Sequence, residues 1–238
     1  MFCVSDEEEF VMKSPSSKKN PKKRKRDEES TESTETAKEN AFCIVDNEAN
    51  KLANYIYHRN NHVYLYTLIN NYTSIKFMDS AESAVQFIMK NKSESALLGI
   101  RETLPLVVHI NSPGGSVFSV FAMIDRLRQL KSMYGIEYHS VIEGRAASAA
   151  TLLSVTADRR FITKYGYMLI HQLSTYFVGK YNEICDDKSN ADELMRRIKE
   201  IYSDHATIPE NKLDEILKHD LYWNAKKCLK YGLVQEVL

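Results

Sequence analysis

Hydrophobic residues are distributed unevenly along the chain. Residues 13–36 contain no Ala, Val, Ile, Leu, Met, Phe, Trp, Tyr or Cys, whereas apolar residues recur regularly from about Ala41 onward. A segment without apolar side chains buries too little surface to offset the entropy cost of ordering it. The pattern therefore predicts a disordered, charged N-terminal tail over residues 1–40 and a folded domain over residues 41–238.

The folded part alternates between strand and helix patterns. Ser80 is expected to cap a helix, because apolar residues follow it at helical spacing, at Ala81, Ala84, Val85, Ile88 and Met89. Further helices are expected from Val117 to Leu130, from near Ser148, and from about Asn182 to Tyr202. Strands are expected at residues 62–66, 106–110, 138–142, 161–162 and 168–170, and the chain closes with residues 234–238.

Two of these strands carry more specific expectations. Leu106 to Ile110 is a continuous apolar run, which is typical of a strand that is buried on both faces. The strand at residues 138–142 is expected to end at Gly144. Because strands and helices alternate, the sequence predicts an α/β fold with a mainly parallel sheet and right-handed crossovers.

Composition and charge exclude several classes of protein. The 238 residues include 32 basic and 32 acidic side chains, so a uniformly basic nucleic-acid binder is excluded and no nucleic acid is expected as a partner. The cysteines (Cys3, Cys43, Cys185 and Cys228) form no Cys-x-x-Cys pair and lie far from histidines at ligand spacing, so no metal site is expected. No apolar run approaches the ~18 residues that a membrane helix needs. We expect a soluble intracellular protein with no membrane association.

The predicted tail contains a dense basic run followed by acidic residues. The run has the form of a monopartite nuclear import signal, and its basic residues are Lys22, Lys23, Arg24, Lys25 and Arg26. A solvated tail of mixed charge is the alternative interpretation. Localisation in the cytoplasm or the nucleus is therefore expected.

Three polar residues lie where predicted strands end, which is where parallel sheets carry their sites. Ser148 follows a strand among small residues, His171 directly follows the strand at 168–170, and Asp220 lies near the C-terminus. Together these residue types suffice for nucleophilic acyl transfer, as nucleophile, general base and orienting group. Gly114 and Gly115 have no side chain to shield their backbone N–H groups from an oxyanion.

Each of these residues also has an ordinary structural interpretation. A serine among alanines commonly lets a helix pack closely, and a histidine after a strand is commonly a satisfied structural residue. An aspartate before a helix or strand is usually a cap, and a double glycine after proline is usually a turn. Spacing alone does not choose between the two interpretations.

Longer motifs resemble those of a known family. Ile110-Asn111-Ser112-Pro113-Gly114-Gly115 and Gly144-Arg145-Ala146-Ala147-Ser148 resemble the signature and nucleophile motifs of the Clp protease proteolytic subunit (ClpP) family. Met168-Leu169-Ile170-His171-Gln172 is similar to its histidine segment. Asp220-Leu221-Tyr222-Trp223-Asn224-Ala225, with Tyr231-Gly232-Leu233-Val234, is similar to its C-terminal segments. These blocks occur in the family's order over about residues 104–238.

The resemblance implies a site and a mechanism. It implies Ser148 as nucleophile, His171 as general base and acid, and Asp220 as orienting residue of a serine endopeptidase. An oxyanion hole would come from the backbone N–H groups of Gly115 and Ala149. An extended polypeptide substrate would bind between residues 116–118 and 173–175, and the substrate-binding residues are expected to be Ser116, Val117 and Ser174.

The resemblance also implies an architecture and partners. The fold would be the ClpP/crotonase-like spiral of repeated β-β-α units, with a protruding handle helix from about Asn182. The subunits would form a homo-oligomer of heptameric rings, with a separate AAA+ unfoldase consuming ATP. No cofactor or metal is implied. This chain has no Gly-x-x-x-x-Gly-Lys-Ser/Thr loop of its own.

The sequence departs from the family at several points, and alternatives stay open. Leu173-Ser174-Thr175-Tyr176 stands where the family usually has Pro and then a Gly-Gly pair, and the family's apolar N-terminal loops are not recognisable. One alternative is a non-catalytic ClpP-like ring subunit that acts as a scaffold or regulator. Another is a different enzyme of the crotonase-like fold, an acyl-CoA hydratase or a Ser-Lys signal-peptide peptidase.

Overall fold

A computed structural model describes residues 54–99 and 103–238 of the chain. The predicted tail, its basic run from Lys22 to Arg26, and the first part of the predicted domain lie outside the described residues. In chain order the elements are β1 (Ile56–Arg59), β2 (His62–Leu65), α2 (Asn71–Leu97), β3 (Leu106–Ser112), α3 (Val117–Tyr134), β4 (Tyr138–Ala147), α4 (Ala149–Val155), β5 (Arg159–Ile162), β6 (Tyr167–Leu169), α5 (Tyr181–His205), α6 (Glu210–Leu217), β7 (Trp223–Asn224), α7 (Ala225–Lys230) and β8 (Glu236–Val237).

Within these residues the strands form one mainly parallel sheet. Its order is β1-β2-β3-β4-β5-β8, and every neighbouring pair from β2 to β8 is parallel. β1 is antiparallel to β2 and forms a hairpin that the sequence did not predict, because its pattern Ile-Tyr-His-Arg buries only Ile56. The predicted α/β fold with a mainly parallel sheet is confirmed.

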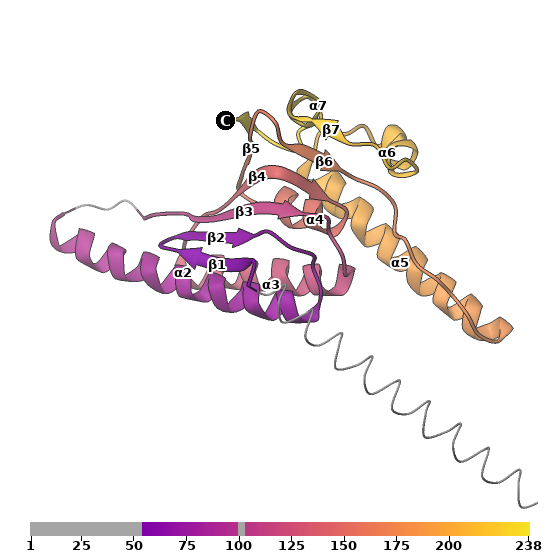
Figure 1. Cartoon of the computed structure of the whole chain (residues 1–238), viewed down its shortest axis with the longest axis horizontal. Helices are drawn as coiled ribbons and strands as arrows, with labels where there is room; N and C mark the ends of the chain where they lie inside the picture. The colour runs from indigo at the N-terminus through magenta and orange to yellow at the C-terminus, as the bar shows by residue number, and fades with distance from the viewer. Residues whose placement is uncertain (1–53, 100–102) are drawn as a thin grey trace, which may run out of the picture. The chain divides into compact units, whose positions relative to one another are not determined.

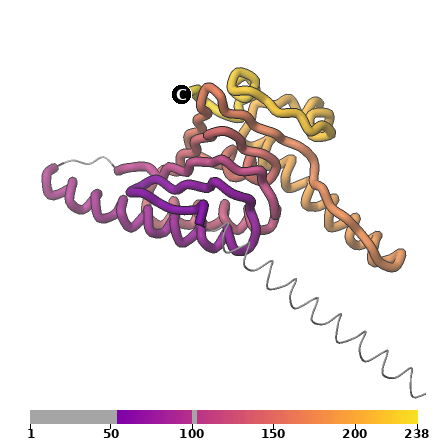
Figure 2. The backbone as a smooth tube through the Cα atoms, in the orientation of Figure 1, coloured from indigo at the N-terminus to yellow at the C-terminus, as the bar shows by residue number. Residues whose placement is uncertain are grey.

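Two helices cover one face of this sheet. α2 and α3 lie side by side beneath β1 to β3, as Figures 1 and 2 show, and α2 contacts both β1 and β2. The side chains between these layers are fully buried and include Phe77 and Ile88 of α2 and Met123 of α3. Burying large apolar side chains in this way supplies most of the stabilising free energy.

The prediction that β3 is buried on both faces was wrong. Leu106, Val108 and Ile110 are buried against the helices, whereas Val107 and His109 on the opposite face are half-buried. That face is polar instead: His109 Nε2 lies 2.8 Å from His62 Nδ1, and His109 Nδ1 lies 2.9 Å from Glu143 Oε1. Successive side chains of a strand point to opposite faces of the sheet. Val107 and His109 therefore share one face, and that face is not part of the buried core.

Ser80 does not begin a helix, contrary to the prediction. α2 begins nine residues earlier than Ser80, at Asn71. Its cap is Asn70, whose side chain accepts a hydrogen bond from Thr73 N, while the Thr73 hydroxyl accepts one from Asn70 N. This reciprocal pair satisfies two backbone donors at once, which a single serine inside a helix cannot do. Ser80 is buried within α2.

Gly144 does not end β4, which was also expected. β4 continues to Ala147 because its second half has a partner of its own: Arg145, Ala146 and Ala147 pair with β6. A strand persists past a glycine when the pairing that follows satisfies its backbone groups. The continuation carries β4 to the residue just before Ser148.

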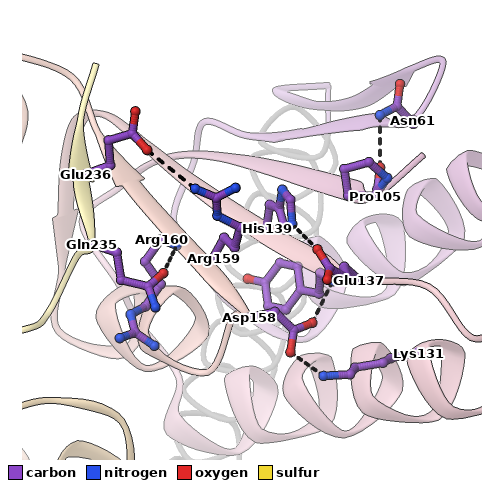
Figure 3. Close-up of polar contacts among 11 residues, drawn as sticks. Asn61, Pro105, Lys131, Glu137, His139, Asp158, Arg159, Arg160, Gln235 and Glu236 are labelled. Atoms are coloured by element: carbon purple, nitrogen blue, oxygen red, sulfur yellow. Dashed lines mark hydrogen bonds and ion pairs between the residues drawn. The ribbon is translucent and has the colours of Figure 1, made fainter. Parts of the chain in front are cut away.

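Polar contacts join the chain at the amino-terminal edge of the sheet (Figure 3). The side chain of Asn61, before β2, donates to the carbonyl of Pro105, before β3, at 2.9 Å. Asp158, before β5, pairs with Lys131 and accepts from the N–H of Tyr138 at 2.9 Å. The candidate site residues Ser148 and His171 lie at the opposite end of the sheet, where the parallel strands end.

The C-terminal third departs from the layered core. α5 covers the predicted helix from Asn182 to Tyr202, and only Ile198 and Tyr202 near its end are buried, so most of it extends away from the sheet (Figure 1). α6, β7 and α7 follow, and the sequence predicted none of them. They are short, at eight, two and six residues respectively.

Candidate active site

Ser148 occupies a strained backbone conformation between β4 and α4. Its dihedral angles are φ 54° and ψ −128°, and it is the residue immediately before α4. A residue with a side chain in such a region costs about 1–3 kcal/mol and persists only where its surroundings hold it. Strain of this kind occurs at sites where a side chain must be aimed out of a tight turn.

Backbone contacts hold Ser148 on both sides. Its N–H donates to the carbonyl of Leu169, at the end of β6, at 2.8 Å. Its carbonyl accepts from the Thr151 N–H at 2.9 Å and from the Thr151 hydroxyl at 2.6 Å. The N–H contact ties Ser148 to the strand that leads directly to His171.

His171 and Asp220 form a short hydrogen-bonded pair. His171 Nδ1 lies 2.6 Å from Asp220 Oδ1. The side chain of His171 is 22% exposed and that of Asp220 is 76% exposed, so water reaches the carboxylate but the imidazole is largely enclosed. The loop of Asp220, between α6 and β7, is fixed beside the histidine because the N–H of Gln172 donates to the Leu217 carbonyl at 2.7 Å.

One cavity brings the serine and the histidine together. Ser148 and His171 both line a cavity of about 310 Å³. The expected substrate-binding residues Ser116, Val117 and Ser174 line the same cavity. The structure records no hydrogen bond between these two described residues, Ser148 and His171. Catalytic hydrogen bonds commonly tighten only in the complex with substrate.

The two expected oxyanion donors also face this cavity. Gly115 and Ala149 both line it. The backbone of residue 115 forms a parallel bridge with Ile69, in which Ile69 N–H donates to the Gly114 carbonyl at 2.8 Å and Ser116 N–H donates to the Ile69 carbonyl at 2.9 Å. That bridge uses neither the N–H nor the carbonyl of Gly115 itself. A Cβ at this position would lie 2.1 Å from the Ile69 carbonyl oxygen, so the close approach requires glycine.

Comparison with known proteins gives the family. The family model described as Clp protease matches residues 61–238, which is most of the chain. The chain belongs to the Clp protease family. This membership confirms the predicted family and agrees with the α/β fold described above.

Curated relatives of this Clp family chain are similar at modest identity. It is 28% identical over 137 residues to the ATP-dependent Clp protease proteolytic subunit 2 of Treponema denticola, covering 57% of this chain and 66% of the relative. It is 31% identical over 136 residues to the ATP-dependent Clp protease proteolytic subunit 2 of Streptomyces coelicolor, covering 55% and 60%. A relative from Porphyromonas gingivalis, named ATP-dependent Clp protease proteolytic subunit, is 29% identical over 136 residues, covering 55% and 58%. The matched part therefore spans less than two thirds of the length of each.

The cavity in this Clp family chain has an apolar wall that was not predicted from the sequence. Leu152 of α4 and Leu194, Ile198 and Tyr202 of α5 line the side next to Ser148. The α5 residues are spaced four apart, which places them on one face of the helix. This apolar stripe within an otherwise charged helix is the pattern from which these cavity residues could have been predicted.

A metal site requires grouped ligand side chains, and a membrane-spanning helix requires a long apolar run. Across residues 54–99 and 103–238, no three His, Cys, Asp or Glu side chains are grouped so that they could hold a metal ion. Within the same residues, no helix combines the length and the apolar character needed to span a membrane.

Proposed function

We propose that this chain is a serine endopeptidase that hydrolyses peptide bonds with Ser148, His171 and Asp220. The observation that carries the proposal is the His171–Asp220 pair, 2.6 Å apart, whose imidazole lines the same cavity as Ser148. Membership of the Clp protease family supports it. A strained serine next to a histidine that a carboxylate orients is the arrangement that acyl transfer requires.

In the proposed mechanism His171 acts as a base and then as an acid in each half-reaction. His171 Nε2 takes the hydroxyl proton of Ser148 as Oγ attacks the carbonyl carbon of the scissile bond. The N–H groups of Gly115 and Ala149 donate to the oxyanion that forms. His171 then gives its proton to the leaving amine as the C–N bond breaks. In the second half-reaction His171 deprotonates water, whose oxygen attacks the acyl carbon, and then returns the proton to Ser148 Oγ as the ester bond breaks. Asp220 accepts from the Nδ1–H throughout and stabilises the imidazolium.

The substrate would be an extended polypeptide that pairs with backbone on two sides of the cavity. Residues 170–178 carry no assigned helix or strand, and Ser174 and Thr175 within this segment are exposed. Gln172 and Leu173 already use their N–H groups, on the Leu217 carbonyl and the Met195 sulfur, so residues 174–178 would be the part that offers backbone donors and acceptors to a peptide added as a strand. Residues 116–118 would form the other side, with Ser116 and Val117 next to the substrate.

The assembly is a further part of the proposal. Several relatives are named as proteolytic subunits of an ATP-dependent protease, which supports a homo-oligomeric chamber served by a separate AAA+ unfoldase. Most of α5 is exposed and extends from the core, so a large surface is available to a second subunit. Native mass spectrometry of the full chain is expected to give rings, heptameric by the family resemblance. A monomer at all concentrations would contradict the chamber.

Hydrolysis of a short fluorogenic peptide by the full chain tests the proposed activity. Ser148→Ala should lower turnover by roughly the factor of 10⁶ that loss of a nucleophile costs in such triads. The control is Ser203→Ala, at an exposed position of α5, which should leave turnover unchanged. If the assembled wild-type chain does not hydrolyse the peptide, the proposal fails in favour of a non-catalytic scaffold subunit.

We propose nuclear import for the basic run from Lys22 to Arg26. The proposal rests on its sequence alone, since a dense cluster of Lys and Arg is the form that import signals take. The full chain fused to a fluorescent reporter is expected in the nucleus, and alanine at these positions should return it to the cytoplasm. An unchanged distribution in the alanine variant would end the proposal.

A further inference from the structure

A chain of hydrogen bonds connects α5 to the backbone of Ser148. The Thr151 hydroxyl lies 2.6 Å from the carbonyl oxygen of Ser148, to which it donates. The Tyr202 hydroxyl lies 2.6 Å from the same Thr151 oxygen. A threonine hydroxyl has one proton to donate, and here it donates that proton in the hydrogen bond to the Ser148 carbonyl. Tyr202 therefore donates to Thr151, and the chain runs from Tyr202 through Thr151 to Ser148.

Both hydroxyl groups are shielded from water. Thr151 is 0% exposed and Tyr202 is 1% exposed. Burial raises the pKa of Tyr202 well above its ordinary value, so its hydroxyl stays protonated and remains a donor at neutral pH. In such surroundings a hydrogen bond is electrostatically stronger than in water, and an unmade one is costly.

The carbonyl that these bonds hold shares a peptide group with a proposed oxyanion donor. The carbonyl of Ser148 and the N–H of Ala149 belong to one planar peptide unit. In a trans peptide these two groups point in opposite directions. Fixing the carbonyl toward Thr151 therefore fixes the direction of the Ala149 N–H, and Ala149 lines the cavity.

We propose that Tyr202 and Thr151 are positioning residues that orient the Ala149 N–H toward the oxyanion of the reaction. The inference rests on the proposed peptidase function. It adds a role for the hydrogen-bond chain that runs from Tyr202 of α5 through Thr151 to Ser148. This hydrogen-bond chain would act on a negative charge that develops only in the transition state. Its loss should therefore lower kcat and leave KM nearly unchanged.

Conservative variants of the full chain separate the two hydroxyl groups from the shapes that carry them. Tyr202→Phe keeps the ring that lines the cavity, Thr151→Val keeps the branched side chain, and Thr151→Ser keeps the hydroxyl. We expect kcat for the fluorogenic peptide to fall about tenfold in Tyr202→Phe and in Thr151→Val, the effect of one buried hydrogen bond. KM should change less than about twofold, and Thr151→Ser should retain most of the wild-type kcat.

A second buried tyrosine, Tyr138 of β4, provides a matched control because it also donates to α4. The buried Tyr138 hydroxyl donates to the carbonyl of Leu153 in α4 at 2.8 Å. Tyr138→Phe therefore removes the same group from a bond to the same helix without touching the peptide unit of Ser148. It should lower thermal stability much as Tyr202→Phe does, while its kcat stays at the wild-type value.

The variant that combines Tyr202→Phe and Thr151→Val tests whether the two residues act in series. Because Tyr202 acts through Thr151, adding Tyr202→Phe to Thr151→Val should lower kcat no further. If the wild-type chain is active and the kcat of Tyr202→Phe matches that of Tyr138→Phe, the positioning role is wrong and the peptidase stands. If the wild-type chain hydrolyses nothing, the proposed function is wrong, and the positioning role is wrong with it.

Discussion

Gly114 lies against the backbone of Ser148 so closely that no side chain fits between them. A Cβ at residue 114 would lie 2.7 Å from the Cβ of Ser148 and 2.3 Å from the carbonyl oxygen of Ala147. Real Cβ atoms do not approach other atoms this closely, so only glycine allows the loop after β3 to pack against the turn that carries Ser148. The double glycine therefore shapes the turn of Ser148 through Gly114, in addition to the N–H that we propose Gly115 supplies.

The first prediction follows from this contact. Gly114→Ala should displace Ser148 and lower peptide hydrolysis by roughly 10²-fold or more, since small misplacements of reacting groups have effects of that size. The control is Gly135→Ala at the end of α3, where φ is 60° and a Cβ would meet nothing within 4 Å. It should cost about 1 kcal/mol of stability and leave hydrolysis unchanged. Equal loss of activity in the two variants would contradict the role of the contact.

The second prediction concerns the carboxylate next to the histidine. Asp220→Asn should lower kcat by roughly 10³–10⁴-fold, because an amide favours the wrong tautomer of His171. Asp214→Asn is the control: Asp214 also lies in this region, in α6, but pairs with Lys199 at 2.6 Å and not with His171. Turnover within about twofold of wild type in Asp220→Asn would contradict a triad.

The third prediction concerns stability at mildly acidic pH. Burial lowers the pKa of His62 and of His205 below the ordinary value of 6.5, and the neighbouring His109 and Arg160 lower them further. Below about pH 6.5 the unfolded chain therefore binds protons more readily than the folded chain does, and the free energy of unfolding falls as pH falls. The midpoint of urea unfolding should be lower at about pH 5.5 than at about pH 7.5.

Variants show whether these two histidines cause the loss. The drop between the two pH values should shrink when His62 and His205 are both replaced by Gln. It should persist in full when His58, which is exposed in β1, is replaced by Gln. A drop of the same size in all three proteins would assign the pH dependence to other groups.

The fourth prediction concerns the reactivity of two cysteines. Cys228 in α7 is fully buried, and burial raises the pKa of its thiol to about 12, whereas Cys185 in α5 is exposed. Only a thiolate reacts, so iodoacetamide should modify Cys185 in the folded chain and spare Cys228. Peptide-resolved mass spectrometry measures both, and urea should expose Cys228. Equal reaction in the folded chain would mean that α7 does not pack as described.

The local parts of the fold could be predicted from the sequence, and two of the errors, at Ser80 and Gly144, share one cause. β3, α3 and α4 follow from runs and periods within a few residues, and so does the placement of Ser148 and His171 at strand ends. Ser80 and Gly144 were misread because distant or reciprocal partners decide their roles. Asn70 and Thr73 cap the helix together, and β6, about twenty residues further on, extends β4 beyond Gly144.

The candidate site shows the same limit. The residues that make up the proposed triad were found because their neighbouring motifs resemble a family. Tyr202 and Thr151 lie 51 residues apart, and neither belongs to one of those motifs. Their hydrogen bond arises only when α5 packs against α4, and no periodicity in the sequence encodes which tyrosine meets which threonine.

The central claim is that Ser148 is an activated nucleophile. The most direct test is to treat the purified full chain with a fluorophosphonate probe and locate the adduct by mass spectrometry, with Ser148→Ala in parallel. We expect stoichiometric modification at Ser148 in the wild-type chain and none in the variant. An assembled wild-type chain that carries no adduct at Ser148 would contradict it.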